Sequence, residues 1–140
     1  MTAAGGTAGR TNSGAGRVLI AVYGLFALAA TSRAAVQLAT RYTEAPVAYL
    51  LSALAGVIYL VATFTLARGS RTSRRIARAA IVVELVGVLT VGTLSLADPA
   101  AFPRATVWSV YGIGYGFVPL VLPVLGLIWL ARTRPASGAG

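Results

Sequence analysis

The sequence predicts an all-α fold, a four-helix transmembrane bundle with its N-terminus and C-terminus on the cytoplasmic side. Of the 140 residues, 57% are hydrophobic and 11% are charged, whereas about a quarter of the residues of an ordinary soluble domain are charged. Four long apolar stretches are separated by short segments that hold most of the arginines. These two observations place the chain in a lipid bilayer.

The membrane domain is predicted over residues 17–134. Residues 1–16 and 135–140 are expected to be disordered tails, because their Gly, Ala, Ser and Thr cannot bury enough apolar surface to fold. The four predicted spans are residues 18–38, 47–67, 76–97 and 107–131. Each has the roughly 20 residues that a helix needs to cross about 30 Å of hydrocarbon. Each must be helical because lipid offers the backbone no hydrogen-bond partner.

Proline and tryptophan mark the ends of these spans. Pro46 suits the first turn of the second helix, and the loop from Asp98 to Pro103 cannot continue the third. Trp108 and Trp129 are 21 residues apart, which separates their indoles by about 31 Å along one helix. The fourth span is therefore expected to be one helix with a tryptophan at each membrane interface.

The arginines set the expected orientation. With the N-terminus inside, nine of the twelve arginines lie on cytoplasmic segments and only Arg41 and Arg104 lie in the outer loops. This positive-inside bias predicts a multi-pass protein of a bacterial inner or plasma membrane. A signal peptide cleaved after Ala29 is the alternative for the first span. The apolar run resumes through Leu38, which favours a retained span.

The chain has neither histidine nor cysteine, and this excludes most site chemistry. No thiolate, disulfide, zinc site, His-ligated haem or Ser-His-Asp triad can form. The three carboxylates, Glu44, Glu84 and Asp98, are too scattered to form a transition-metal site. We therefore predict no catalytic residues, no metal and no cofactor. An intramembrane enzyme would have only Glu84 as acid or base.

Glu84 and Arg33 lie inside predicted spans and, with Tyr59 and Tyr115, form the candidate intramembrane polar site. Glu84 lies about 11 Å from the cytoplasmic end of its span, where an ionised carboxylate is costly, so it should face the bundle interior or water. It is either a proton- or cation-coupling group or a hydrogen-bonded structural one. Arg33 lies about 12 Å higher, so a direct ion pair would need tilted helices. The expected partners at matching depth are Tyr23, Tyr59 or Thr63 for Glu84, and Tyr49, Ser52, Thr93 or Tyr115 for Arg33.

Four arginines at the start of the third span have the spacing of one helix face. They are Arg71, Arg74, Arg75 and Arg78. Positive charge near a helix N-terminus opposes the macrodipole, so lipid phosphates or an acidic partner should neutralise it. The alternative interpretation is that the segment only determines the topology. Nucleic acid is not expected, because no aromatic residues are interleaved with the charges. The expected partners are a bilayer with anionic headgroups and either a second copy or another membrane protein.

Small residues four positions apart predict close helix packing. The pairs are Gly112 with Gly116 and Ser52 with Gly56. Residues 113–116 also match the core of a potassium filter, but the preceding Thr, the pore helix and the re-entrant loop are missing, so we do not identify a filter. Pro119 and Pro123 are expected to kink the fourth helix.

Two motifs carry a resemblance to known proteins. They are Ser32-Arg33-Ala34-Ala35-Val36-Gln37-Leu38 and the run from Trp108 through Tyr111-Gly112-Ile113-Gly114-Tyr115 to Pro119-Leu120-Val121-Leu122-Pro123. With residues 23–42, 46–63 and 106–130 they resemble small four-helix integral membrane proteins of high-GC Gram-positive bacteria. The resemblance implies the fold and carries no activity. The chain is also similar to small multidrug resistance transporters, whose embedded glutamate lies in the first span rather than the third.

Two functions follow as expectations. The leading one is a non-enzymatic subunit or partner-binding scaffold that acts through its glycine faces and its arginine loop. The alternative is a proton- or cation-coupled small-solute transporter that uses Glu84, as an oligomer because four short spans enclose little internal space.

Overall fold

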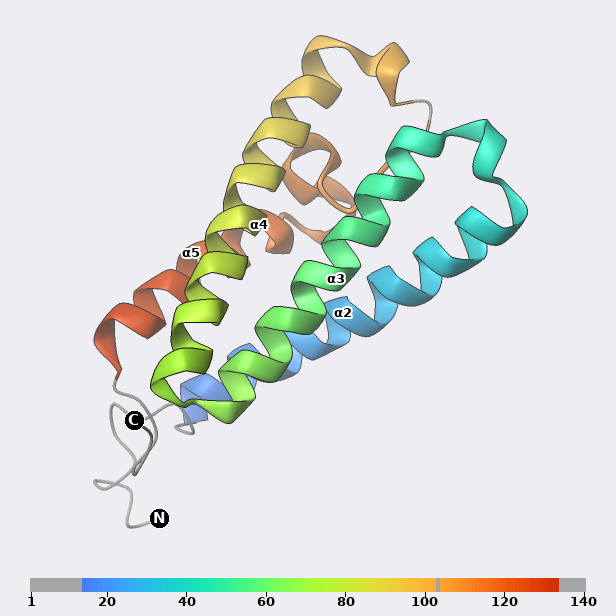
Figure 1. The fold of residues 1–140 in the computed structure, drawn as a ribbon. Helices are drawn as coiled ribbons and strands as arrows, with labels where there is room; N and C mark the ends of the chain where they lie inside the picture. Colours follow the sequence, from blue (N-terminus) through green and yellow to red (C-terminus); the bar gives the residue numbers. More distant parts are fainter. Residues whose placement is uncertain (1–13, 103, 134–140) are drawn as a thin grey trace.

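The computed structural model describes residues 14–102 and 104–133, and over these residues the chain is all-helical with no strand, as predicted. The elements in order are α2 (Gly14–Thr40), η1 (Tyr42–Glu44), α3 (Pro46–Arg68), α4 (Arg71–Ala97), η2 (Pro99–Ala101), η3 (Ser109–Tyr115) and α5 (Val118–Arg132). The start of α2, the α3–α4 turn and the end of α5 lie at one end of the molecule (Figure 1). Most of the two predicted tails falls outside the described residues, but residues 14–16 are already helical.

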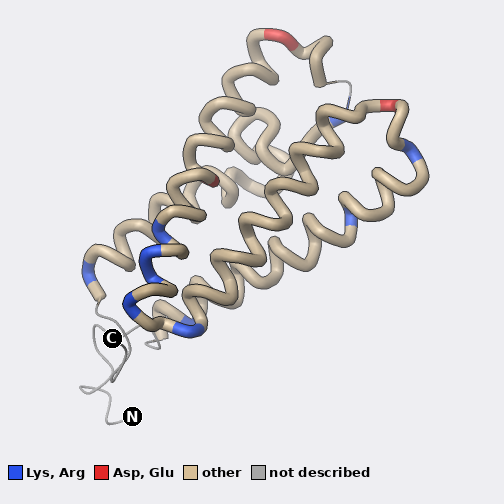
Figure 2. The backbone as a smooth tube through the Cα atoms, viewed as in Figure 1, with Lys and Arg blue, Asp and Glu red and all other residues tan. Residues whose placement is uncertain are grey.

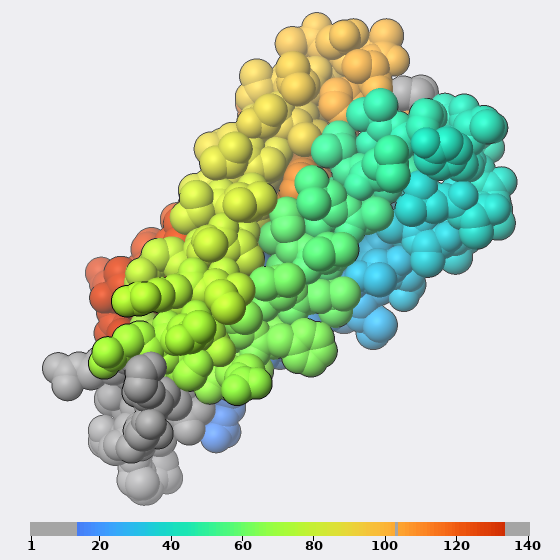
Figure 3. Space-filling model, in the orientation of Figure 1, coloured from blue at the N-terminus to red at the C-terminus, as the bar shows by residue number. Residues whose placement is uncertain are grey.

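Helices α2, α3 and α4 are each long and apolar enough to cross a membrane. They contain the predicted spans 18–38, 47–67 and 76–97 and extend each by a few residues. On the face drawn in Figure 3, α3 and α4 lie side by side and side chains fill the space between their lower halves. Large apolar side chains such as Leu28 and Phe64 stay exposed on the outside, as lipid-facing positions do.

A tight turn makes α3 and α4 antiparallel neighbours. Pro46 occupies the first turn of α3, as predicted. Gly69 ends the helix at a left-handed φ of 70°, a conformation that costs glycine little. Ser70 then starts α4, because its side chain accepts a hydrogen bond of 3.1 Å from the Ser73 backbone N–H.

The fourth apolar segment, residues 107–131, is not one straight helix. It forms η3 and α5, whose axes differ by 98°. Five residues at the break have φ between 48° and 86°: Val110, Tyr111, Gly112, Gly116 and Phe117. For a β-branched valine this conformation is strained. Helix α5 has 15 residues and is about 22 Å long, which is short for a hydrocarbon core of about 30 Å.

Two glycines of α4 hold the bent segment against the bundle. A Cβ atom at Gly87 would lie 2.6 Å from Cζ3 of Trp108, and one at Gly92 would overlap the Tyr111 ring. Trp108 is only 2% exposed, so it lies inside the bundle and not at the interface assigned to it from the sequence. Gly87 lies ten residues before the end of α4, which places the Trp108 ring about 15 Å below that end.

The left-handed backbone also changes the role of the predicted glycine pair. Gly112 and Gly116 do not share a helix face, because both adopt positive φ at the break. A Cβ atom at Gly112 would lie 2.6 Å from Pro119, which itself sits in the first turn of α5. In the other pair, Gly56 lies against Thr31 of α2, since a Cβ atom there would be 2.8 Å from the Thr31 hydroxyl.

Candidate functional site

Glu84 lies in the middle of α4 and is completely buried. Its Oε1 accepts a hydrogen bond of 2.7 Å from the hydroxyl of Tyr23, a buried residue of α2. Its Oε2 is also buried and has no hydrogen-bond partner among the described residues. An unsatisfied buried acceptor costs about 1–3 kcal/mol, so a proton or a cation on this carboxyl would be stabilising.

A row of rings connects the Glu84 carboxyl to the Arg33 guanidinium. The row consists of Glu84, Tyr23, Tyr59, Phe26, Tyr115 and Arg33. Successive ring centroids lie 6.2, 5.8 and 5.7 Å apart, within the range of favourable aromatic pairs. At the outer end, Arg33 Nη1 donates a 2.7 Å hydrogen bond to the Tyr115 hydroxyl.

The four residues of the predicted polar site therefore come from four elements and belong to one series of contacts. The two charged members do not pair with each other: each is hydrogen-bonded to a tyrosine. Tyr115 is one of the four partners expected for Arg33, and Tyr23 is one of the three expected for Glu84. Phe26, which links the tyrosines, was not identified from the sequence.

Trp108 is a second residue that sequence reasoning missed. Its Nε1 donates a 3.0 Å hydrogen bond to the hydroxyl of Tyr59, and both side chains are buried. The bond fixes the bent segment to α3 while Gly87 provides the space on α4. No spacing in the sequence pairs these residues, because the contact depends on the break at residues 110–117.

The four arginines at the start of the third span do not share one exposed face. Arg71, Arg75 and Arg78 are exposed, whereas Arg74 is only 6% exposed. Its Nη2 donates to the backbone oxygens of Leu130 at 2.8 Å and Thr133 at 2.9 Å, and to the Thr133 hydroxyl at 3.1 Å. Its guanidinium also lies 5.8 Å from the Trp129 ring centroid. Arg74 thus caps the C-terminal end of α5.

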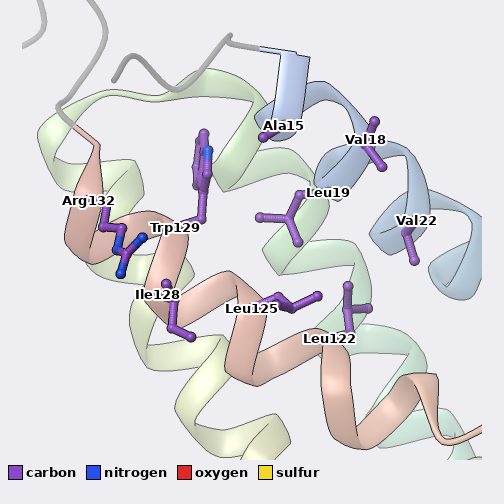
Figure 4. A pocket seen from close by; sticks show the side chains of 9 residues that line it. All are labelled: Ala15, Val18, Leu19, Val22, Leu122, Leu125, Ile128, Trp129 and Arg132. Carbon is purple, nitrogen blue, oxygen red and sulfur yellow. The ribbon is translucent and has the colours of Figure 1, made fainter. Parts of the chain in front are cut away.

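An apolar groove separates α2 from α5. It has a volume of about 370 Å³ and is lined by Ala15, Val18, Leu19, Val22, Leu122, Leu125, Ile128, Trp129 and Arg132. Leu19 of α2 and Leu122 of α5 extend into the space between the two helices (Figure 4). The helices are therefore well packed in the order α2, α3, α4 and α5, but the first and last of them are not closed against each other.

No group of three or more potential metal ligands occurs within the described ranges. Arg104 and Glu44 form an exposed ion pair of 3.0 Å between the outer loops, a type of contact that contributes little stability. The polar side chains thus divide into a row that is buried at Glu84 and exposed at Arg33, and a group of arginines at one end. Comparison of the chain with protein-family models, curated proteins and solved structures finds no match.

Proposed function

We propose that this chain is a small integral protein of a bacterial inner membrane that crosses the bilayer four times, with both termini in the cytoplasm. The η3–α5 segment makes the fourth crossing. The positive-inside distribution supports the orientation, since the arginine-rich α3–α4 turn lies at the same end as the start of α2 and the end of α5 (Figure 1).

Within that membrane we propose a non-enzymatic role, as a subunit or partner-binding scaffold. The observation that carries this role is the groove between α2 and α5. Apolar side chains from two helices make up most of its lining, with Arg132 at the end of α5, so a transmembrane helix of a partner can pack against the apolar part. The sealed Glu84–Tyr23 pair fits the same role, because a carboxyl enclosed by three helices stabilises the bundle rather than contacting a substrate.

Single cysteines test this role cleanly, because the natural chain has none. Leu125→Cys places a thiol in the groove, and Val57→Cys places a matched thiol on an exposed position of α3. Each variant carries a photoactivatable benzophenone maleimide in native membranes. We expect Leu125→Cys to give one discrete protein adduct whose partner also copurifies in fixed stoichiometry, and Val57→Cys to give none. Equal adduct patterns, or lipid adducts alone, would contradict a scaffold role.

The orientation has its own test. Thr72→Cys and Ala100→Cys place thiols at exposed positions at opposite ends of the bundle. A membrane-impermeant maleimide added to intact spheroplasts should label Ala100→Cys only, and disruption of the membrane should expose Thr72→Cys. The reverse pattern would overturn the proposed orientation without affecting the fold.

A proton- or cation-coupled transporter is the second candidate, and the unpartnered Oε2 of Glu84 favours it. A buried carboxylate oxygen with no donor is a position that a proton or cation can occupy and leave. Voltage-driven proton uptake into reconstituted vesicles, followed with an entrapped pH dye, tests this candidate. Loss of uptake in Glu84→Gln but not in Glu44→Gln, with both variants folded, would establish it, and equal fluxes in all three proteins would exclude proton coupling.

A further inference from the structure

The arginines of the third span form a pocket together with the end of α5. From α4 the pocket is lined by Arg71, Arg74, Arg75 and Arg78. From the end of α5 it is lined by residues that include Leu130 and Thr133. Its volume is about 340 Å³, within the roughly 300–1,000 Å³ of small-molecule sites. Figure 2 shows the positive residues gathered where α4 starts and α5 ends.

The positive charge of this pocket is not balanced within the described part of the chain. Glu44 is paired with Arg104 in the outer loops, and Asp98 begins the outer connection after α4. Glu84 is enclosed and hydrogen-bonded to Tyr23. Four like charges near the N-terminus of a helix also oppose its macrodipole, so a bound anion would stabilise the arrangement.

Arg74 gives the pocket a fixed geometry. Its Nη2 donates hydrogen bonds to the carbonyl oxygens of Leu130 and Thr133, and its guanidinium lies beside the Trp129 ring. These contacts fix the conformation of the Arg74 side chain. Its Nη1 is buried and has no acceptor among the described residues. A buried guanidinium N–H without an acceptor is costly. Arg74, with this unsatisfied Nη1 donor, lines the pocket together with three arginines that are exposed and available to a ligand.

We propose that this pocket binds one phosphate group, which Arg71, Arg75 and Arg78 contact and Arg74 positions. Phosphate suits the pocket because several arginines can each donate paired N–H groups to its oxygens. The proposal does not depend on the scaffold role. The group can come from the headgroup of an anionic lipid, since the pocket lies at the proposed cytoplasmic surface, or from a soluble phosphate.

The test uses the full chain purified in a neutral detergent. Native mass spectrometry counts phosphatidylglycerol molecules retained by each protein, with phosphatidylcholine as the neutral comparison, and thermal unfolding is followed with and without inorganic phosphate at constant ionic strength. Arg75→Gln/Arg78→Gln removes two charges from the pocket. Arg68→Gln/Arg132→Gln is the matched control, because it removes two exposed charges from the same end that do not line the pocket.

The wild-type chain should retain one phosphatidylglycerol or be stabilised by phosphate. The pocket variant should bind about 30-fold more weakly, since each arginine near an anionic group contributes roughly a factor of five, and the control should stay within about threefold. If inorganic phosphate cannot displace the retained phosphatidylglycerol, the ligand is a lipid headgroup. If it does displace the lipid, the pocket binds any phosphate group. No binding by the wild-type chain, or equal losses in the two double variants, would overturn the proposal.

A sign change separates this site from a merely structural role of the same arginines. Without an anion, the pocket variant should unfold at the same temperature as the wild-type chain or a higher one, because it removes repulsion at the start of α4. With phosphate, the wild-type chain should be the more stable of the two. Arg75→Lys/Arg78→Lys keeps the charge and should bind more weakly than the wild-type chain but more tightly than the Gln variant. If the Lys variant bound phosphate no more tightly than the Gln variant, the result would contradict this order.

Discussion

The contact between Gly87 and Trp108 gives the sharpest prediction for stability. In Gly87→Ala, the new Cβ atom would lie 2.6 Å from the indole, whereas ordinary contacts lie at 3.4–4 Å. The indole must therefore move by about 1 Å, because the new Cβ atom is fixed to the α4 backbone. Gly24→Ala is the matched control in another apolar helix, since its nearest neighbour is a Thr63 methyl carbon at an ordinary 3.5 Å.

The magnitude follows from three contributions. Replacing glycine by alanine inside a helix is favourable by up to about 1 kcal/mol, and this contribution is common to both variants. Overpacking at Gly87 costs about 1–3 kcal/mol. Displacing Trp108 also weakens its hydrogen bond to Tyr59, which is worth about 1 kcal/mol. Gly87→Ala should therefore be less stable than Gly24→Ala by about 2–4 kcal/mol.

The free energy of unfolding can be measured by SDS titration in mixed micelles, followed by circular dichroism. A double-mutant cycle with Trp108→Leu assigns the effect, because a smaller side chain should remove most of the penalty of Gly87→Ala. If Gly87→Ala were as stable as Gly24→Ala, or if its penalty were unchanged by Trp108→Leu, the indole would not occupy this position inside the bundle.

Three further predictions concern the bent segment and the polar row. Gly112→Ala should destabilise the protein by about 2–4 kcal/mol through its positive φ and the proline behind it, whereas Gly114→Ala, which has open space and an ordinary φ, should change stability by less than about 1 kcal/mol in the same SDS titration. Tyr23→Phe should cost about 1–3 kcal/mol because it removes the only hydrogen bond described for the buried carboxyl, and Tyr49→Phe, whose hydroxyl has no described partner, should cost less, with thermal unfolding as the measurement. Arg74→Gln should lower the unfolding temperature by several degrees and increase proteolysis at the end of α5, because it removes the hydrogen bonds to the carbonyls there. Arg75→Gln, at an exposed position, should do neither.

The three continuous helices could be predicted from the sequence because each is defined by local properties. A run of apolar residues long enough to cross the bilayer must be helical, and Pro46 and the loop after Asp98 supply local stop and start signals. The sequence also limited the expected partners of Arg33 to four residues that include Tyr115, because depth along a straight helix follows from residue number alone. These predictions required no knowledge of how the helices pack.

The fourth segment could not be predicted in this way. Hydropathy over residues 107–131 is uniform and does not distinguish a straight helix from a bent one. The two glycines at 112 and 116 have a spacing that suits both a helix face and a pair of left-handed turns, and only tertiary contacts decide between them. The position of Trp108 followed from the same choice: on a straight helix it lies at the interface, and on the bent segment it enters the bundle.

The buried position of Arg74 was also beyond sequence reasoning. Spacing placed it on one face with three other arginines, which is correct for the helix but says nothing of what faces it. The end of α5 presents backbone carbonyls without helical partners at that position, and the buried Arg74 guanidinium donates hydrogen bonds to them.

The short final helix has a consequence for the surrounding lipid. A 15-residue helix matches a hydrocarbon layer about 22 Å thick, about 8 Å less than the bilayer average, whereas the 27 residues of α2 and of α4 exceed it. The molecule therefore presents unequal hydrophobic heights on its two flanks. In the proposed membrane arrangement, acyl chains beside the shorter flank would compress or tilt, and relief of that mismatch would favour protein over lipid as a neighbour on that flank.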